Sequence, residues 1–241
     1  MSDFSQSEVR NLLLRALPQE AFHLLQPELE VVELPVKTGL IEPGVPPELV
    51  YFLERGLASL VATNSDDESV EVGHIGFEGM AGAHVFLKVE QSPNRTFMQI
   101  EGVAITAPVS KLMTAVEQVP AAHDLFLRYV HCCELQLAHS ALANARYNMH
   151  ERLARWLLMC HDRLEDDDLP LTHEFLSLML GVRRSGVTNE IHVLEGVQAI
   201  KATRANIRIL NRPKLEDMAG GSYGIPEHEY EKYIGFTIRR S

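Results

Sequence analysis

The chain has 241 residues, a formal net charge of −11, 46% hydrophobic residues and 23% charged residues, which is typical of a globular protein and excludes a mostly disordered chain. No apolar run approaches the roughly 20 residues that a membrane helix needs. The start has no basic and apolar stretch of a secretory signal, and three cysteines form no disulfide framework, so we expect a cytoplasmic protein without a membrane partner.

The negative charge is unevenly distributed along the chain. Residues 1–150 contain 9 Lys and Arg against 19 Asp and Glu, a net charge of −10, whereas residues 151–241 contain 13 against 14, a net charge of −1. Within residues 172–212 the basic residues outnumber the acidic ones by 6 to 3. A basic island in an acidic chain is compatible with a nucleic-acid partner for that region.

After a short amphipathic segment, residues 30–112 show the pattern of β-structure. Apolar stretches of four to six residues alternate with turn-forming residues, and no helical period is visible. This pattern predicts an antiparallel sandwich or roll. Residues 51–53 and 57–61 look like a hairpin around Arg55 and Gly56.

Residues 121–147 contain neither Gly nor Pro and predict one long helix. Its length favours packing against a partner helix, and apolar residues recur at the required spacing of three to four: Phe126, Val130, Cys133, Leu137 and Ala141. Asn148 followed by Glu151 resembles a capping box that begins another helix. We therefore place a domain border near residues 147–149.

The next stretch predicts a winged helix. Thr172 is a candidate N-cap for a helix that ends at Leu180, and Gly181 supplies a tight turn before a second helix over residues 184–194. Two short strands at residues 200–202 and 207–209 then enclose a polar, basic tip.

The second of these helices suits the major groove of DNA, because its exposed side combines cations with short polar side chains. Arginines at its start can pair with phosphate or guanine, asparagine suits adenine, and basic residues of the strand pair can reach the DNA backbone. The candidate DNA-binding residues are Arg183, Arg184, Ser185, Thr188, Asn189, His192, Lys201 and Arg204. The alternative is that they form the solvated face of a packing helix.

Five segments (residues 50–59, 73–80, 171–172, 180–188 and 194–196) resemble the CRP/FNR family of bacterial transcription regulators. The resemblance implies an α+β fold, with an antiparallel β-roll of the cyclic-nucleotide-binding type and a winged helix-turn-helix. The division that it implies is 1–120 for the sensor roll, 121–147 for a dimerisation helix and 148–241 for the DNA-binding domain. It also implies three partners, namely double-stranded DNA, a second copy of the chain and RNA polymerase.

By position, Arg184, Ser185 and Asn189 match the base-reading residues of the family. The best-known members have Arg-Glu at the first pair and Arg at the third, so only Arg184 is kept here. We therefore expect a DNA half-site that differs from the family's commonest one. Glu190 is a second departure, because the family usually has an apolar or small residue there, and we expect a surface position or a rotated helix.

The resemblance also locates a candidate effector site in the roll at Gly79, Gly82, Arg95 and Thr96. Arg95-Thr96 resembles the family's phosphate-binding pair, although a surface arginine in a β-turn is an equal alternative. Residues 79–83 contain no acid for the ribose, and Leu137-Ala138 of the long helix offer no hydroxyl to the purine. These departures argue against cAMP as the effector, and leave another small molecule or none.

Other chemistries fit the sequence poorly. An iron–sulfur cluster needs four thiolates, and the chain has only Cys132, Cys133 and Cys160. The histidines at positions 123, 131 and 139 are interpreted as solvent-facing, and no catalytic motif is present. We expect no enzyme activity, catalytic residue, metal or cofactor. The alternative function is a small-molecule-binding regulatory module whose helix-turn-helix contacts a protein partner.

Overall fold

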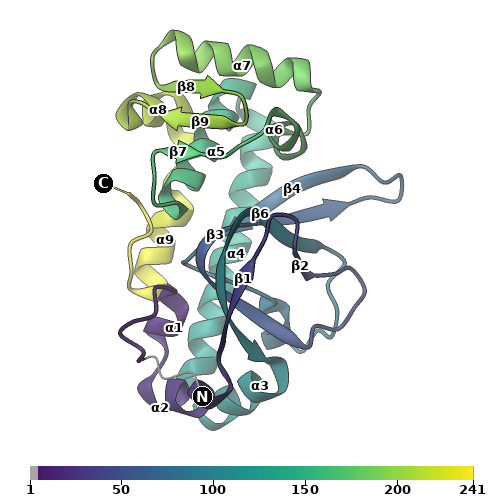
Figure 1. Ribbon diagram of the computed structural model, residues 1–241, viewed down its shortest axis with the longest axis vertical. Coiled ribbons are helices and arrows are strands. Elements are labelled where there is room, and N and C mark those ends of the chain that lie inside the picture. Colours follow the sequence, from purple (N-terminus) through teal and green to yellow (C-terminus); the bar gives the residue numbers. More distant parts are fainter. Residues whose placement is uncertain (1–4, 241) are drawn as a thin grey trace.

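The computed structural model describes residues 5–240, apart from the side chain of Arg184. Its N-terminal part is an antiparallel sheet with the hydrogen-bonded order β1-β6-β3-β4, in which β2 also pairs with β6 and β5 with β3 (Figure 1). The elements are α1 (Leu12–Ala16), α2 (Gln19–Leu25), η1 (Gln26–Glu28), β1 (Glu30–Leu34), β2 (Gly39–Ile41), β3 (Leu49–Thr63), β4 (Ser69–Ile75), β5 (Met80–Ala81), η2 (Ala83–Leu87) and β6 (Arg95–Pro108). The expected antiparallel roll is thus confirmed.

The hairpin expected around Arg55 and Gly56 is wrong. β3 continues through this point and pairs with β6 on both sides of it, with irregular register. Gly56 has a φ of +85°, and a Cβ there would lie 2.6 Å from the carbonyl oxygen of Glu101. The glycine therefore allows a close approach of two strands at an irregular point in the ladder, not a chain reversal. The β region also ends before residue 112, because α3 (Val109–Gln118) follows β6 directly.

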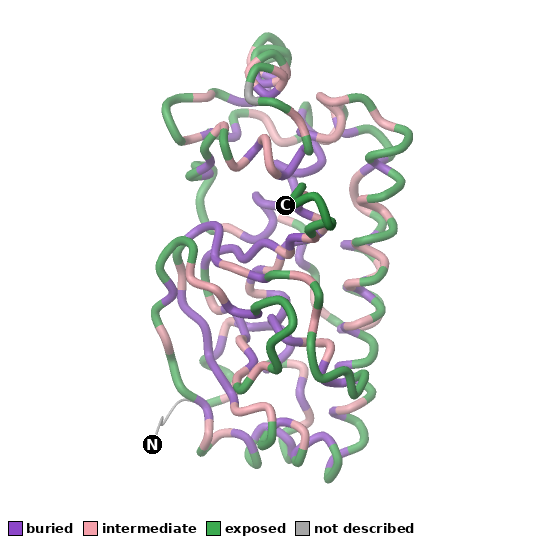
Figure 2. Tube along the Cα trace, turned by 90° about the vertical axis from the view of Figure 1, so that its right-hand side faces the viewer, coloured by how far each residue is buried: buried purple, intermediate pink, exposed green. Residues whose placement is uncertain are grey.

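The long helix is present as α4 (Pro120–Arg146). It runs along one side of the molecule, and much of its outward face is exposed (Figure 2). Phe126 is fully buried against the roll and stacks on Phe86 with ring centroids 4.1 Å apart. The proposed helix seam is therefore divided, since Phe126 and Cys133 pack against the roll whereas Leu137 and Ala141 are exposed.

The winged helix follows and has its own apolar core. It consists of α5 (Met149–Arg163), β7 (Asp168–Leu169), α6 (His173–Leu180), α7 (Arg184–Gly196), β8 (Ile200–Thr203) and β9 (Asn206–Ile209). The predicted capping box is confirmed, because the side chain of Asn148 accepts from the backbone N–H of Glu151 at 3.1 Å and the Glu151 carboxylate accepts from the N–H of Asn148 at 2.7 Å. The acidic residues 165–168 follow α5, and the last of them, Asp168, is the first residue of β7.

The C-terminal residues return to the N-terminal part of the fold, which the sequence did not predict. They form α8 (Arg212–Ala219), η3 (Gly220–Ser222) and α9 (Ile225–Ile234). α9 lies beside α4, as Figure 1 shows. Tyr230, Ile234 and Ile238 are buried in the core that also contains the first two helices.

Buried polar contacts join the roll to the winged helix. The indole Nε1 of Trp156 on α5 donates to the carboxylate of Glu71 on β4 at 2.7 Å. Arg163 at the end of α5 donates from Nε to the carboxylate of Glu78 at 2.7 Å, and the two side chains are only 2% and 5% exposed. The winged helix is therefore packed against the roll as part of one folded unit.

Candidate nucleic-acid interface

The helix-turn-helix is set by local contacts that the sequence indicated. The hydroxyl of Thr172 accepts from the N–H of Phe175 at 3.2 Å and caps α6. Gly181 ends that helix with a φ of +65°, in the left-handed region that favours glycine. Arg183 is the N-cap of α7. The apolar side of α7 is buried as predicted, through Val187, Ile191 and Leu194.

The opposite side of α7 is exposed at one end of the molecule, beside the strand pair β8–β9 (Figure 1). Arg183, Ser185, Asn189 and His192 are exposed, as expected for groups that contact a partner. Thr188 is half-buried instead, with its hydroxyl 3.4 Å from Nδ1 of His173. It therefore lies toward α6 and contributes less to the exposed face. The side chain of Arg184 lies outside the described residues.

The glutamates of α7 are held by neighbours. Glu190 is only 21% exposed and lies 3.5 Å from Nδ1 of His150 at the start of α5, so it turns toward the protein, not to the surface. Glu195 accepts from the N–H of Ala202 in β8 at 2.9 Å. Its other oxygen is 3.2 Å from Nδ1 of His192. Glu195 thus connects the exposed face of α7 to the strand pair β8–β9 with its turn (residues 200–209), which we call the wing.

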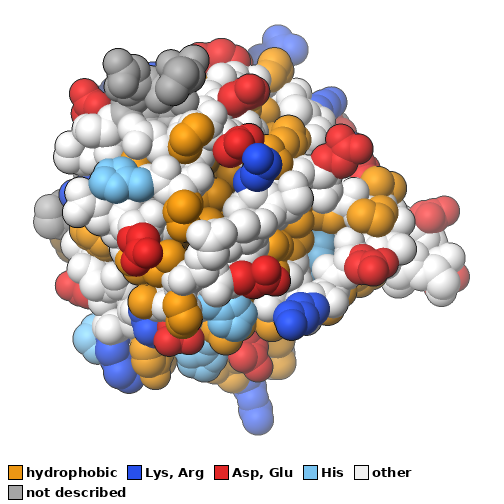
Figure 3. Space-filling view, turned by 90° about the horizontal axis from the view of Figure 1, so that it is seen from below, with side chains coloured by type: hydrophobic (Ala, Val, Ile, Leu, Met, Phe, Trp, Pro, Cys, Tyr) orange, Lys and Arg blue, Asp and Glu red, His pale blue; other side chains and the backbone are white. Residues whose placement is uncertain are grey.

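The wing presents its basic residues to solvent. Lys201 and Arg204 are exposed, and Arg204 lies in the turn between β8 and β9. Arg208 is 3.8 Å from the carboxylate of Asp168, and both side chains are about half exposed. Lys201 and Arg204 are exposed, and unlike Arg208 they have no carboxylate partner among the described residues. The opposite end of the molecule carries acidic, basic and histidine side chains scattered among apolar ones (Figure 3).

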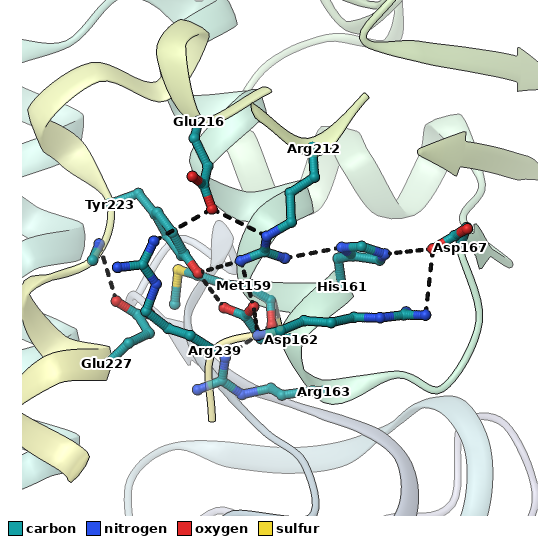
Figure 4. A network of polar contacts seen from close by, with 12 residues as sticks. Met159, His161, Asp162, Arg163, Asp167, Arg212, Glu216, Tyr223, Glu227 and Arg239 are labelled. Atoms are coloured by element: carbon teal, nitrogen blue, oxygen red, sulfur yellow. Dashed lines mark hydrogen bonds and ion pairs between the residues drawn. The ribbon is translucent and has the colours of Figure 1, made fainter. Parts of the chain in front are cut away.

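Arg212, counted in the basic island of the sequence, is turned inward. Its guanidinium donates to Asp162 at 2.7 Å, to Glu216 at 3.0 Å and to Nδ1 of His161 at 2.9 Å (Figure 4). Because His161 accepts at Nδ1, its proton is on Nε2, which donates to Asp167 at 2.9 Å. The network fastens α8 to α5. The basic island is therefore less positive at the surface than its sequence count.

Tyr223 extends the same network to the C-terminal residues. Its hydroxyl donates to Asp162 at 2.5 Å, and the backbone N–H of Arg240 donates to Asp162 at 3.0 Å. No motif indicates this cluster, because residues near position 162 and residues near position 223 are far apart along the chain.

The four candidate effector residues lie in two places on the roll. Gly79 and Gly82 flank β5, which pairs with β3 at Tyr51. Arg95 and Thr96 pair with the other end of β3. A Cβ on Gly79 would lie 2.2 Å from the hydroxyl of Tyr129, so packing against α4 explains this glycine. Gly82 adopts a left-handed conformation, with a φ of +99°.

Arg95 and Thr96 differ in exposure. Arg95 is exposed and donates from Nε to the carboxylate of Glu42 at 3.2 Å. Thr96 is buried in the sheet. An anionic ligand at Arg95 would have to displace Glu42.

The three thiols are protonated at neutral pH. Burial raises the pKa of Cys132 to about 12 and that of Cys133 to about 11, and it raises the pKa of Cys160 as well. Within residues 5–240 no three His, Cys, Asp or Glu side chains come together as metal ligands. No helix of the described chain has the length and the apolar character to cross a lipid bilayer.

Residues 151–218 match the family model of the Crp-like helix-turn-helix domain. The match covers α5, α6, α7, the wing and most of α8, and so includes all the candidate DNA-binding residues. Comparison with curated protein sequences gives no significant match.

Solved structures show the same fold. A putative transcriptional regulator of the CRP/FNR family from Eubacterium rectale matches with a TM-score of 0.65 and 15% identity, over 86% of this chain and 97% of that one. FixK2 from Bradyrhizobium japonicum matches with a TM-score of 0.68 and 16% identity, over 80% and 98%. A CRP-family regulator from Thermus thermophilus gives 0.60 and 19%, over 80% and 98%.

These comparisons confirm the resemblance to CRP/FNR regulators for the fold and for the C-terminal domain. The solved structures share the fold of this chain, and the family model identifies residues 151–218 as a Crp-like helix-turn-helix domain.

Proposed function

We propose that this protein is a sequence-specific DNA-binding transcription regulator that acts as a homodimer on a two-fold symmetric site. The observation that carries the proposal is the exposed polar face of α7 next to a basic wing, within a domain of the Crp-like helix-turn-helix type. A single α-helix fits the major groove, and its first turns reach the base edges.

The proposed roles of the residues follow from their positions. Ser185 and Asn189 face outward from the first turns of α7 and read bases, together with Arg184, whose role comes from the resemblance alone. Arg183 at the N-cap and Lys201 and Arg204 of the wing contact phosphates. His192 extends the exposed face, and Thr188 makes a smaller, indirect contribution through His173.

α4 supplies the proposed dimer contact. Its outward face exposes Leu127 and Leu142, which are 37% and 45% exposed, and also Ala141, the residue before Leu142. Leu127 and Ala141 are separated by two heptads, which is the repeat of a helix pair. Two copies joined along α4 would present two α7 helices to half-sites about one helical turn apart.

In this proposal residues 1–120 form the sensor, residues 121–147 the dimer helix and residues 148–241 the DNA-binding part, while the last helix of that part packs on α4. The effector is unassigned, and the departures at residues 79–83 and at Leu137-Ala138 argue against cAMP. A role for Gly79, Gly82, Arg95 and Thr96 in effector binding stays a prediction. Contact with RNA polymerase rests on the family resemblance alone.

The first experiment is selection and sequencing of genomic fragments bound by the purified protein at physiological salt. We expect an enriched palindrome for the wild type. Asn189→Ala should lower specific affinity by about 1–3 kcal/mol, and Arg184→Ala should abolish the sequence preference without dissociating the dimer. Arg55→Ala removes an exposed cation of the roll and serves as the control, which should keep the wild-type affinity and sequence preference.

Salt dependence separates DNA binding from the alternative, a protein-interaction surface. A DNA-binding face releases counterions, so the affinity should fall steeply with salt, and Arg183→Ala should reduce the slope by about 1. Lack of any enriched sequence, together with a salt-insensitive partner interaction, would favour the alternative.

Sedimentation of Leu127→Glu/Ala141→Glu tests the dimer, with Leu24→Glu on α2 as the exposed apolar control. Only the double variant is expected to dissociate.

A further inference from the structure

Two arginines of α5 line a crevice where the roll meets the winged helix. The crevice has a volume of about 40 Å³ and lies between β4, the C-terminal half of α4, α5 and the end of α6. Arg152 and Arg155 are three residues apart and therefore share one side of α5. At 10–15 Å³ for each water, the crevice has room for about three water molecules, or for a small anion.

Neither arginine forms a direct ion pair with a described carboxylate, although Glu227 and Glu71 attract Arg155 from farther away. Arg155 is only 6% exposed, and its Nε donates to the carbonyl of Ser222 at 3.0 Å. Its Nη2 is 3.4 Å from the hydroxyl of Ser140. Nη2 of Arg152 donates to the carbonyl of Leu180 at 2.7 Å. All these acceptors are neutral.

The carboxylate that also lines the crevice is engaged elsewhere. Glu71 accepts from the hydroxyl of Ser59 at 2.6 Å and from Trp156 at 2.7 Å, and it lies 3.4 Å from Nδ1 of His74. Burial lowers the pKa of the Arg155 guanidinium, and it outweighs the opposing attraction of Glu227 and, more weakly, of Glu71. Burial lowers the pKa of Arg152 too. An enclosed cation without a paired anion is costly, and an external anion would remove the cost.

Several donors of the two side chains have no acceptor in the described chain. They are Nη1 of Arg155, and Nε and Nη1 of Arg152. Guanidinium groups bind oxyanions in a bidentate manner, and two of them match the double charge of a phosphate better than the single charge of a carboxylate.

We propose that this crevice binds a phosphate group, either as inorganic phosphate or as the phosphoryl end of a small metabolite, through Arg152 and Arg155. Arg155 is enclosed by α4 and by the segment between α8 and α9, so the backbone of a DNA duplex cannot reach it. A bound phosphate would connect α5 with β4, α4 and α6. If the proposed function holds, occupancy therefore changes how firmly the helix-turn-helix is seated on the roll.

The test is titration of the full-length protein with sodium phosphate by calorimetry, at an ionic strength matched with sodium chloride. Saturable binding is expected for the wild type. Arg152 is half-buried and makes one hydrogen bond, and Arg152→Gln should weaken phosphate binding at least tenfold. Arg152→Lys should weaken phosphate binding less, because lysine keeps the positive charge but cannot bind in the bidentate manner of a guanidinium. Arg55→Gln is the matched control and should bind phosphate like the wild type.

Two further titrations identify the ligand class. Acetate should bind much more weakly than phosphate, and equal binding of the two would overturn the preference for a dianion. Glycerol 3-phosphate that binds more tightly than phosphate indicates a phosphorylated metabolite, whereas equal binding indicates phosphate itself, and either result supports the site. The proposal fails if no saturable binding occurs, or if Arg152→Gln binds phosphate as the wild type does.

The effect of phosphate on DNA affinity is measured in a separate experiment. Phosphate that binds the wild type without any change in DNA affinity leaves the site established and refutes only its link to DNA binding.

Discussion

The sharpest prediction concerns the loss of stability when the ion pair between Arg163 and Glu78 is removed. Both side chains are almost fully buried, at 2% and 5% exposure. Nη1 of Arg163 also donates to the carbonyl of Met159 at 2.9 Å, and the second oxygen of Glu78 accepts from the N–H of Gly76 at 3.0 Å. The attraction of Glu78 raises the pKa of Arg163, although burial opposes it. Replacement of Arg163 with Met keeps most of the volume but leaves Glu78 without its cation.

The expected loss of stability is large. Removal of one partner from a buried ion pair costs about 3–5 kcal/mol, because the remaining charge is buried without compensation. For a chain of this size each kcal/mol lowers Tm by about 2–4 °C, so Arg163→Met should lower Tm by roughly 6–20 °C. The companion change Glu78→Gln in the same chain removes the remaining charge and should restore about half of the loss.

The assay is urea unfolding followed by Trp156 fluorescence and by circular dichroism. The four proteins of the double-mutant cycle are compared with Arg55→Met, which removes an exposed cation and should lie within 0.5 kcal/mol of the wild type by the usual range for surface substitutions. If the free energy of unfolding of the single Arg163→Met variant lies within about 1 kcal/mol of the wild-type value, the ion pair does not stabilise the contact between roll and winged helix. The reasoning from burial would then be wrong.

Three other predictions concern stability and reactivity. Asn148→Ala removes the cap that accepts from Glu151, and urea unfolding should show a loss of about 1 kcal/mol, whereas Asn148→Ser should be nearly neutral. Burial lowers the pKa of His74 and of His161 in the folded state, so both are neutral there, and stability should decline as the pH falls below about 6.5, where the unfolded chain takes up protons. Unfolding measured from pH 8 to pH 5 should show this decline, and a flat profile would contradict it. Because the pKa of every thiol is raised, a thiol reagent should react slowly with the native protein at pH 8 and rapidly in urea, and fast native labelling would disprove the assigned burial.

The winged helix was predictable because its signals are local. The Thr172 cap, the Gly181 turn and the periodic burial of α7 all act within a few residues, so their pattern is visible in the sequence. The Arg55-Gly56 hairpin failed for the complementary reason. Glycine permits both a turn and a close approach of strands, and only the partner strand at Glu101 decides between them.

Long-range contacts were not predictable. Nothing near Glu71 or Trp156 in the sequence indicates that they pair, because they are separated by 85 positions. Likewise, the spacing of Arg152 and Arg155 places them on one side of a helix, but their lack of a carboxylate partner is known only once the neighbouring elements are in place. The basic island was overestimated for the same reason, since Arg212 is neutralised inside the fold.

The return of the C-terminal residues to the first core has a consequence for synthesis of the chain. Tyr230, Ile234 and Ile238 share that core with the first two helices, and the hydroxyl of Tyr230 donates to the carbonyl of Glu78 at 2.6 Å. During translation the roll emerges from the ribosome before these side chains do, so its core is completed only after residues 225–238 have emerged as well. Nascent chains halted before residue 225 should therefore expose an apolar surface that a chaperone can bind, and a messenger truncated there should yield an aggregating product, not a folded roll.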